Sequence, residues 1–151
     1  MAWQQEALLV VRVLIAVVLG GVVGWQREHV GREAGVRTYA AVSLGSCVFG
    51  LISLTFGGDT HVASGVVTGI GFLCAGVILK EQGRVIGLTT AATLWATASL
   101  GLAIAYGRFV LGALVSIILF ILLAVPLKKR VQRRLTDNQA IDAHRPAQHS
   151  S

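Results

Sequence analysis

The stretch GIGFLCAGVILKEQGRVIGLTTAATLW, residues 69–95, decides the class of fold. Its two flanks are apolar enough to lie within a membrane, and a short charged connection joins them. Both flanks nevertheless contain weak helix formers, glycines before the connection and threonines after it. In lipid there is little hydrophobic force between helices, so small residues that let two backbones approach closely supply much of the packing. The stretch therefore predicts two membrane helices that pack through glycine and threonine.

The composition of the whole chain agrees with a membrane protein. Of its 151 residues 54% are hydrophobic and 13% are charged, against about 25% charged in an average soluble domain. Apolar segments, each close to the roughly 20 residues that cross a bilayer, lie near 5–26, 37–57, 62–79, 89–106 and 108–127. Gly57-Gly58 and Gly107 predict tight turns between segments. We expect an all-α bundle of about five transmembrane helices in residues 1–130, then a basic and finally disordered cytoplasmic tail in 131–151.

The distribution of Lys and Arg predicts the orientation of this bundle. With five spans, the 1–2 connection, the 3–4 connection and the tail lie on one side, and the cations there are Arg27, Arg32, Arg37, Lys80, Arg84, Lys128, Lys129, Arg130, Arg133 and Arg134. Only Arg108 lies in the connections of the other side. The positive-inside rule then gives an outer N-terminus and a cytoplasmic C-terminus. Because the net charge of +6 sits beside apolar runs and in the tail, anionic lipid explains it better than nucleic acid.

Small and hydroxylic residues recur at helical spacing within these segments. We predict helix packing through Gly20 and Gly24 in the first segment and, in the third, through Gly65, Gly69, Gly71 and Gly76. Thr89, Thr93 and Thr97 are spaced four apart, with Thr90 beside the first, and form one polar stripe along the fourth segment. Their hydroxyls can bond the carbonyl one turn back or bond another helix. A hydrated or ligand-facing stripe is the alternative.

Few residues inside the spans have ionisable, nucleophilic or metal-ligating side chains. Arg12 lies about two turns into the first segment, where it can extend to the interface or meet Asp59 on the outer side. Cys47 and Cys74 lack the neighbours of a metal site or a disulfide framework and read as small buried side chains. No carboxylate pair lies at mid-membrane, and no Ser-His-Asp set, HExxH motif or P-loop occurs. We therefore expect no enzyme, no metal and no cofactor.

Several linked blocks resemble the membrane domain of the MgtC/SapB family: RVLIAVVLGGVVGWQRE, AGVRTYAAVSLGSCVFGLIS, DTHVA, VVTGIGFLCAGVIL and GLTTAATLWATASLGLAIAYG. Carried over by motif, the signature positions fall on Arg12, Gly20, Gly24, Arg27, Glu28, Ala34, Gly35, Arg37, Thr38, Asp59, Gly69, Gly71, Phe72, Gly76, Gly87, Thr89, Thr90 and Trp95. Three positions depart from the pattern: Gln26 replaces the usual Glu, His61 lies near the usual Arg, and Cys74 replaces a common Gly. Many members add a soluble ACT-like domain after the last helix, and we expect none here.

The resemblance implies a multi-pass protein of the bacterial inner membrane. It links the chain to Mg²⁺ limitation, stress adaptation and virulence, with ATP synthase or a Mg²⁺-transporting ATPase as partners. We expect a non-enzymatic protein that modulates ion or energy homeostasis by binding other membrane proteins. Assembly into a homo-oligomer is a further option. The alternative is a small oligomeric transporter or channel for an ion or small solute, with the threonine stripe lining its path.

One functional cluster is predicted at the cytoplasmic face. We expect the connection KEQGRVIGLTT to fold back on WQREHVGREAGVRT, with Gly87 turning the chain and Thr89 or Thr90 capping the fourth helix. Glu28 would pair with an Arg or approach that helix N-terminus. The predicted inner-face cluster is Arg27, Glu28, Arg37, Thr38, Arg84, Thr89 and Thr90. Arg12, Asp59, Thr93 and Thr97 are the polar residues within the membrane or toward its outer side. The alternative is a charged rim that only anchors the bundle.

Overall fold

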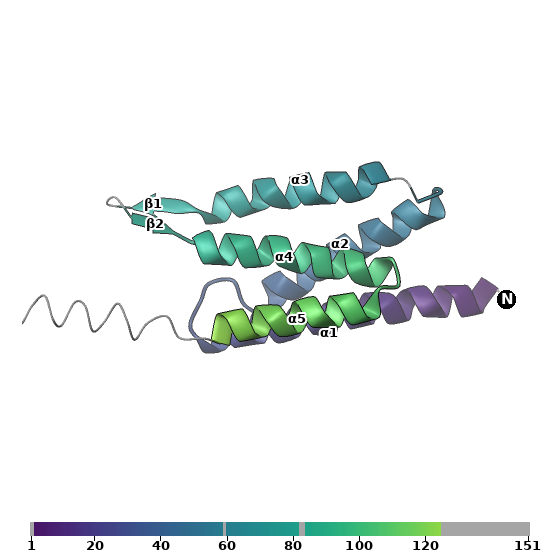
Figure 1. The fold of residues 1–151 in the computed structure, drawn as a ribbon, viewed down its shortest axis with the longest axis horizontal. Helices are drawn as coiled ribbons and strands as arrows, with labels where there is room; N and C mark the ends of the chain where they lie inside the picture. Colours follow the sequence, from purple (N-terminus) through teal and green to yellow (C-terminus); the bar gives the residue numbers. More distant parts are fainter. Residues whose placement is uncertain (1, 59, 82–83, 125–151) are drawn as a thin grey trace, which may run out of the picture.

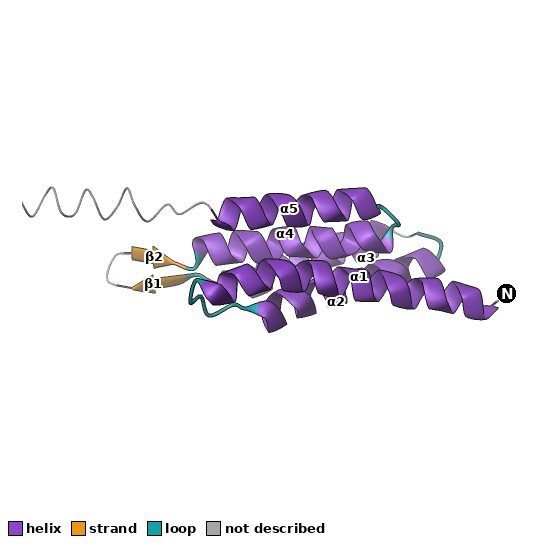
Figure 2. Cartoon of the chain, turned by 90° about the horizontal axis from the view of Figure 1, so that it is seen from below, coloured by secondary structure: helices purple, strands orange, loops and turns teal. Residues whose placement is uncertain are grey.

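Helices that run up and down along one axis form a bundle in the computed structural model, which describes residues 2–58, 60–81 and 84–124 (Figure 1). In chain order the elements are α1 (Ala2–His29), α2 (Val36–Thr55), α3 (Thr60–Val77), β1 (Leu79–Glu81), β2 (Arg84–Ile86), α4 (Leu88–Ala105) and α5 (Phe109–Ala124). The strands pair antiparallel, with Lys80 opposite Val85. They form a hairpin that projects past one end of the bundle (Figure 2). We name this end, which also carries the α1–α2 connection, the hairpin end.

The predicted all-α membrane architecture is confirmed. Each of the five predicted segments is a helix in the part of the chain that the structure describes. Helices α1, α2 and α4 are long and apolar enough to cross a bilayer, whereas α3 and α5 are shorter apolar helices. The β1–β2 hairpin was not predicted, because its short strands read as a charged connection. The expected tail, with its run of cations, lies outside the described residues.

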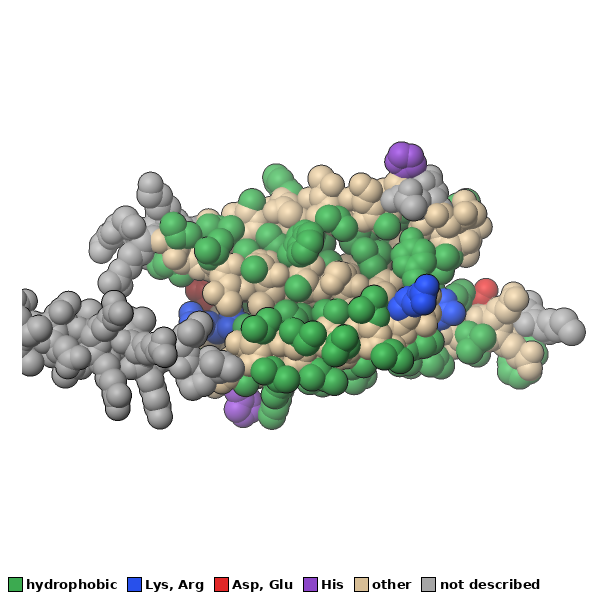
Figure 3. All heavy atoms as spheres, in the orientation of Figure 1, with side chains coloured by type: hydrophobic (Ala, Val, Ile, Leu, Met, Phe, Trp, Pro, Cys, Tyr) green, Lys and Arg blue, Asp and Glu red, His purple; other side chains and the backbone are tan. Residues whose placement is uncertain are grey.

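The outside of the bundle is apolar over most of its length. Hydrophobic side chains are spread along the visible face between the two ends, with backbone and other side chains between them, and the cationic side chains lie near the ends (Figure 3). Phe72 is 86% exposed and Val110 85% exposed. In water such a surface would be costly, because each large apolar side chain contributes about 1.5–3 kcal/mol when it is buried. The surface suits a lipid environment.

Helix α4 lies at the centre of the bundle and contacts each of the other four helices. Leu94, Leu100 and Ile104 on α4 are fully buried, as is Tyr39 on α2. Gly101 brings α4 directly onto α2, since a Cβ atom built on it would collide with the carbonyl oxygen of Ser43. The centre is therefore packed at backbone contact distance, as expected for helices that associate in lipid.

The predicted glycine contacts divide into two groups. A Cβ atom on Gly20 would lie 2.7 Å from the Cβ atom of Ser43, and one on Gly24 would lie 2.7 Å from the Cα atom of Val36. These two residues pack α1 on α2 as predicted. The prediction is wrong within this chain for the third helix, since a Cβ atom would meet no described atom within 4 Å at Gly65, Gly69, Gly71 and Gly76.

The reason is the face that α3 turns toward α4. Val66 and Cys74 are buried, and Ile70 and Val77 are partly buried in the same core. These positions follow one helical face. By helical periodicity Gly65, Gly69 and Gly76 lie on one side of this face and Gly71 on the other. Cys47 and Cys74 are free and buried, as the sequence indicated.

The turns follow the predicted glycines. Gly57, Gly58 and Gly107 adopt φ values of 88°, 76° and 73°, a left-handed region that favours glycine. Gly87, with φ 87°, starts α4 beside the carbonyl of Val77. The turn at Gly87 thus brings α4 back along α3.

Candidate functional site

A polar contact between α1 and α4 lies at the hairpin end. Arg27, on the last turn of α1, donates from its Nη2 atom to Oγ1 of Thr90 at 2.9 Å. Arg27 is only 6% exposed, and its Nε atom is buried without a hydrogen-bond partner. Two members of the predicted inner-face cluster are therefore in direct contact.

A second polar contact continues this cluster toward the middle of the bundle. The hydroxyl of Tyr39 on α2 lies 2.6 Å from Oγ1 of Thr93, and both side chains are buried. Thr93 also donates toward the carbonyl oxygens of Thr89 and Thr90, and Thr97 donates to that of Thr93. Helix-to-helix bonding and carbonyl back-bonding thus engage the hydroxyls of Thr90, Thr93 and Thr97.

Glu28 has a different role from the one expected. Its Oε2 atom accepts a hydrogen bond from the backbone N–H of Val36 at 3.1 Å, at the start of α2. Gly35 makes room for it, because a Cβ atom there would lie 2.7 Å from Oε2. Among the described side chains no ion pair joins Glu28 to an Arg. The carboxylate therefore accepts from the first N–H of α2.

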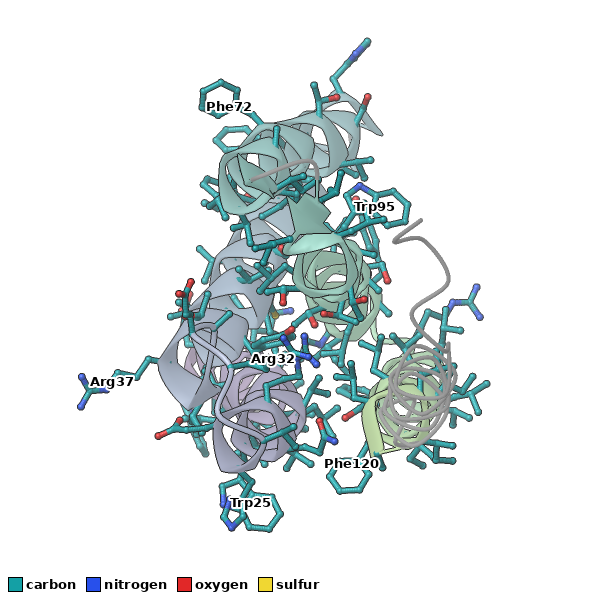
Figure 4. The ribbon with its side chains drawn as sticks, turned by 90° about the vertical axis from the view of Figure 1, so that its left-hand side faces the viewer. Trp25, Arg32, Arg37, Phe72, Trp95 and Phe120 are labelled. Carbon is teal, nitrogen blue, oxygen red and sulfur yellow. The ribbon has the colours of Figure 1, made fainter. Side chains whose placement is uncertain are left out.

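The remaining members of the predicted cluster are dispersed. Arg37 is exposed and points away from the bundle, whereas Arg32 lies over the middle of the same end (Figure 4). Thr38 is half-buried on α2, Thr89 is exposed, and the side chain of Arg84 lies outside the described residues. The hairpin extends away from the α1–α2 connection and does not fold back on it (Figure 1).

The predicted cap of α4 is also wrong. Gly87 occupies the N-cap position and supplies no side-chain hydrogen bond. Neither Thr89 nor Thr90 caps the helix, because both lie inside it. The first N–H groups of a helix have no intrahelical acceptor, so this end keeps its donors and its partial positive charge.

Sequence reasoning missed several polar residues at these contacts. Gln26 is 8% exposed, and its Oε1 atom is buried without a partner. Tyr39 and Ser43 join α2 to its neighbours, with Ser43 donating to the carbonyl of Ala16 at 2.7 Å. A polar aromatic side chain within an apolar segment was the signal for Tyr39. Gln26 gave none, since it adjoins charged residues at a span end and reads as exposed.

The opposite end of the bundle holds the other cation of α1. Arg12 is half-buried, donates to the carbonyl oxygen of Ala105 at 2.8 Å, and lies 6.0 Å from the ring centre of Phe109. A carbonyl and an aromatic face therefore hold its charge at the α4–α5 turn. Asp59, the predicted partner, lies outside the described residues.

An open apolar groove of about 520 Å³ separates α2 from α3. Small residues lie on both of its walls, Ala41 and Gly45 on α2 and Gly65 and Gly69 on α3. Phe49, Val62 and Leu73 add larger side chains. Ser46 also lines it, and its buried hydroxyl has no hydrogen-bond partner. The groove can accept an apolar rod such as a helix.

Comparison with known proteins places these features in one family. The chain matches the MgtC family over residues 13–134. SrpB of Synechococcus elongatus is 41% identical over 139 residues, which cover 81% of this chain and 75% of SrpB. MgtC of Salmonella typhimurium is 40% identical over 126 residues, which cover 82% of this chain and 54% of MgtC.

A third relative is YhiD of Escherichia coli K12, whose name assigns it provisionally to magnesium transport. It is 34% identical over 132 residues, which cover 80% of this chain and 61% of YhiD. The chain thus spans little more than half of the length of MgtC and less than two thirds of YhiD. No solved structure matches.

Proposed function

Because this chain belongs to the MgtC family of membrane proteins, we propose that it acts by binding other membrane proteins, without catalysis. In this proposal it crosses the bacterial inner membrane with five helices and modulates ion or energy homeostasis under Mg²⁺ limitation or a related stress. ATP synthase and Mg²⁺-transporting ATPases are the partner classes to test first, since the family resemblance implies them. The observation that carries the proposal is the open face of α3 at Gly65 and Gly69, which border the groove.

The geometry of that face supports helix docking. A backbone can approach Gly65 and Gly69 without obstruction, because no described atom lies within 4 Å of a Cβ position there. The same spacing on α1 already holds two helices of this chain at contact distance. In lipid, close approach of this kind is a main source of helix association. A transmembrane helix of a partner is therefore the occupant that we propose for the groove.

The charges of the bundle favour binding over passage of a cation. Arg27 is buried near one end and Arg12 is half-buried near the other. A divalent cation that moved along the bundle would meet both positive charges, in surroundings where each pair interaction is stronger than in water. Transport of Mg²⁺ by a single chain is thus disfavoured, and transport by an oligomer becomes an outcome of the test.

The test fills the groove and leaves the fold intact. We expect Gly65→Leu with Gly69→Leu to preserve folded yield, because the new side chains extend into open space. The double variant should lose co-purification with partner proteins from native membranes and lose support of growth at limiting Mg²⁺. Gly71→Leu is the matched control, because Gly71 is equally open on α3 but does not line the groove.

Two results would contradict the proposal. One is a double variant that folds, captures the same proteins and supports growth like the parent chain. The other is Mg²⁺ flux in liposomes that contain this protein alone, at a rate that the double variant retains. The second result would make the transporter the better explanation.

A further inference from the structure

The guanidinium of Arg27 is a buried charge with an incomplete set of partners. Only 6% of Arg27 is exposed. Its guanidinium donates to one described side chain, the neutral hydroxyl of Thr90. Its Nε–H is buried and bonds nothing in the described part of the chain. Arginine keeps its charge in proteins, and a buried charge is costly unless it is paired. The arrangement therefore calls for an acceptor with negative charge.

The N-terminus of α4 lies beside Arg27 and also favours a negatively charged acceptor. Thr90 is the third residue of α4, whose N-cap Gly87 provides no side-chain acceptor. The free N–H groups of the first turn and the helix dipole make this end partially positive. A cation next to a helix N-terminus is normally unfavourable by some tenths of a kcal/mol. Arg32 lies over the same end of the bundle and adds a further positive charge (Figure 4).

The described acids do not supply the missing negative charge. Glu28 is exposed and its Oε2 atom bonds the N–H of Val36. Glu33 is exposed in the α1–α2 connection. Gln26, buried beside Arg27 in α1, is neutral and also lacks a partner for its Oε1 atom. An amide can turn its NH₂ group toward an acceptor, because its oxygen and nitrogen ends are interchangeable in shape.

We propose that Arg27, the hydroxyl of Thr90 and the uncapped N-terminus of α4 bind a phosphate group at the hairpin end. Phosphate fits because its oxygens accept from an Arg fork and from helix N-terminal N–H groups at the same time. The group belongs either to the headgroup of an anionic phospholipid or to free phosphate. Both are available at this place, where the apolar spans end and the interfacial region begins.

The experiment compares ligands on the full chain purified in a nonionic detergent. One arm adds sodium phosphate against sodium chloride at equal ionic strength. The other adds phosphatidylglycerol against a galactolipid, which has no phosphate. We expect one of the two phosphate sources to raise the unfolding temperature by at least about 2 °C at saturation. A shift with inorganic phosphate identifies the free ion, and a shift with phosphatidylglycerol alone identifies the headgroup.

Variants decide whether the shift comes from this site. Arg27→Gln should abolish it, and Arg37→Gln should retain it, since Arg37 points away from the bundle at the same end. Gln26→Glu covers the case in which Arg27→Gln does not fold. It places a carboxylate beside Arg27 and should weaken phosphate binding at least about tenfold by charge repulsion. Native mass spectrometry of the lipid arm should show one retained phosphatidylglycerol fewer in Arg27→Gln than in Arg37→Gln.

Three results would overturn the proposal. The first is an unfolding temperature that neither inorganic phosphate nor phosphatidylglycerol raises, which would mean that no phosphate group binds at Arg27. The second is an equal loss in Arg37→Gln, which would indicate a general attraction of the basic end. The third is a shift that persists in a folded Arg27→Gln or, where that variant does not fold, an unchanged shift in Gln26→Glu. Each result can be obtained without knowing any partner protein.

Discussion

Two pairs of glycines with the same four-residue spacing meet opposite surroundings in this protein. Gly20 and Gly24 on α1 lie against α2, so that a Cβ atom on either would approach that helix within 2.7 Å. Gly65 and Gly69 on α3 border the open groove, where a Cβ atom would meet no described atom within 4 Å. The spacing thus marks a face that can be approached closely. Whether the chain itself closes that face depends on where the neighbouring helix lies.

The serines of α2 show the same contrast. Ser43, on the side of α1, donates to the carbonyl of Ala16. Ser46, one turn further along, lines the groove and has a buried hydroxyl without a partner. Where α1 and α2 are in close contact, the hydroxyl of Ser43 is therefore satisfied within the chain. At the groove, the hydroxyl of Ser46 is enclosed without a hydrogen-bond partner among the described residues.

The largest effect is expected from a single methyl group on the closed face. Gly24→Ala should lower the free energy of unfolding by about 1–3 kcal/mol, because the new Cβ atom meets the backbone of residues 35 and 36. Gly69→Ala should change it by less than about 0.5 kcal/mol, as surface substitutions usually do. Reversible thermal or denaturant unfolding in detergent measures both. Equal losses in the two variants would remove the distinction between the faces.

A smaller effect separates the two serines. Ser43→Ala should cost about 1 kcal/mol, the typical net value of an intramolecular hydrogen bond. Ser46→Ala should cost nothing or stabilise the isolated chain slightly, because it removes a buried hydroxyl that has no partner. The same unfolding measurement applies. A larger loss in Ser46→Ala than in Ser43→Ala would show that the groove wall is bonded internally.

The smallest effect is expected at the bond between α2 and α4. Tyr39→Phe should cost about 0.6 kcal/mol, a typical value for a hydrogen bond between membrane helices. The loss is small because Thr93 retains its contacts with the carbonyls of Thr89 and Thr90. A double-mutant cycle with Thr93→Val isolates the bond, provided that each single variant folds. A coupling of zero would mean that the two hydroxyls only lie close together.

Part of the candidate site could be predicted from the sequence. The connections of the hairpin end pointed to Arg27 and Thr90, and the structure brings these two side chains together. The partner of Glu28 could not be predicted, because several donors at one end of a bundle compete for one carboxylate. Gln26 was missed for a similar reason, since charged neighbours at a span end do not reveal which side chain turns inward.

The sequence by itself determined the five helices and the glycine turns, because apolar length and backbone freedom are local properties of the chain. It also determined the family, through blocks that follow one another in order. Only the tertiary structure decided which glycine face is closed, which threonine meets a partner, and that Arg27 is buried beside an uncapped helix end. These features depend on the relative rotation of helices distant in sequence, which side-chain packing across the whole bundle fixes.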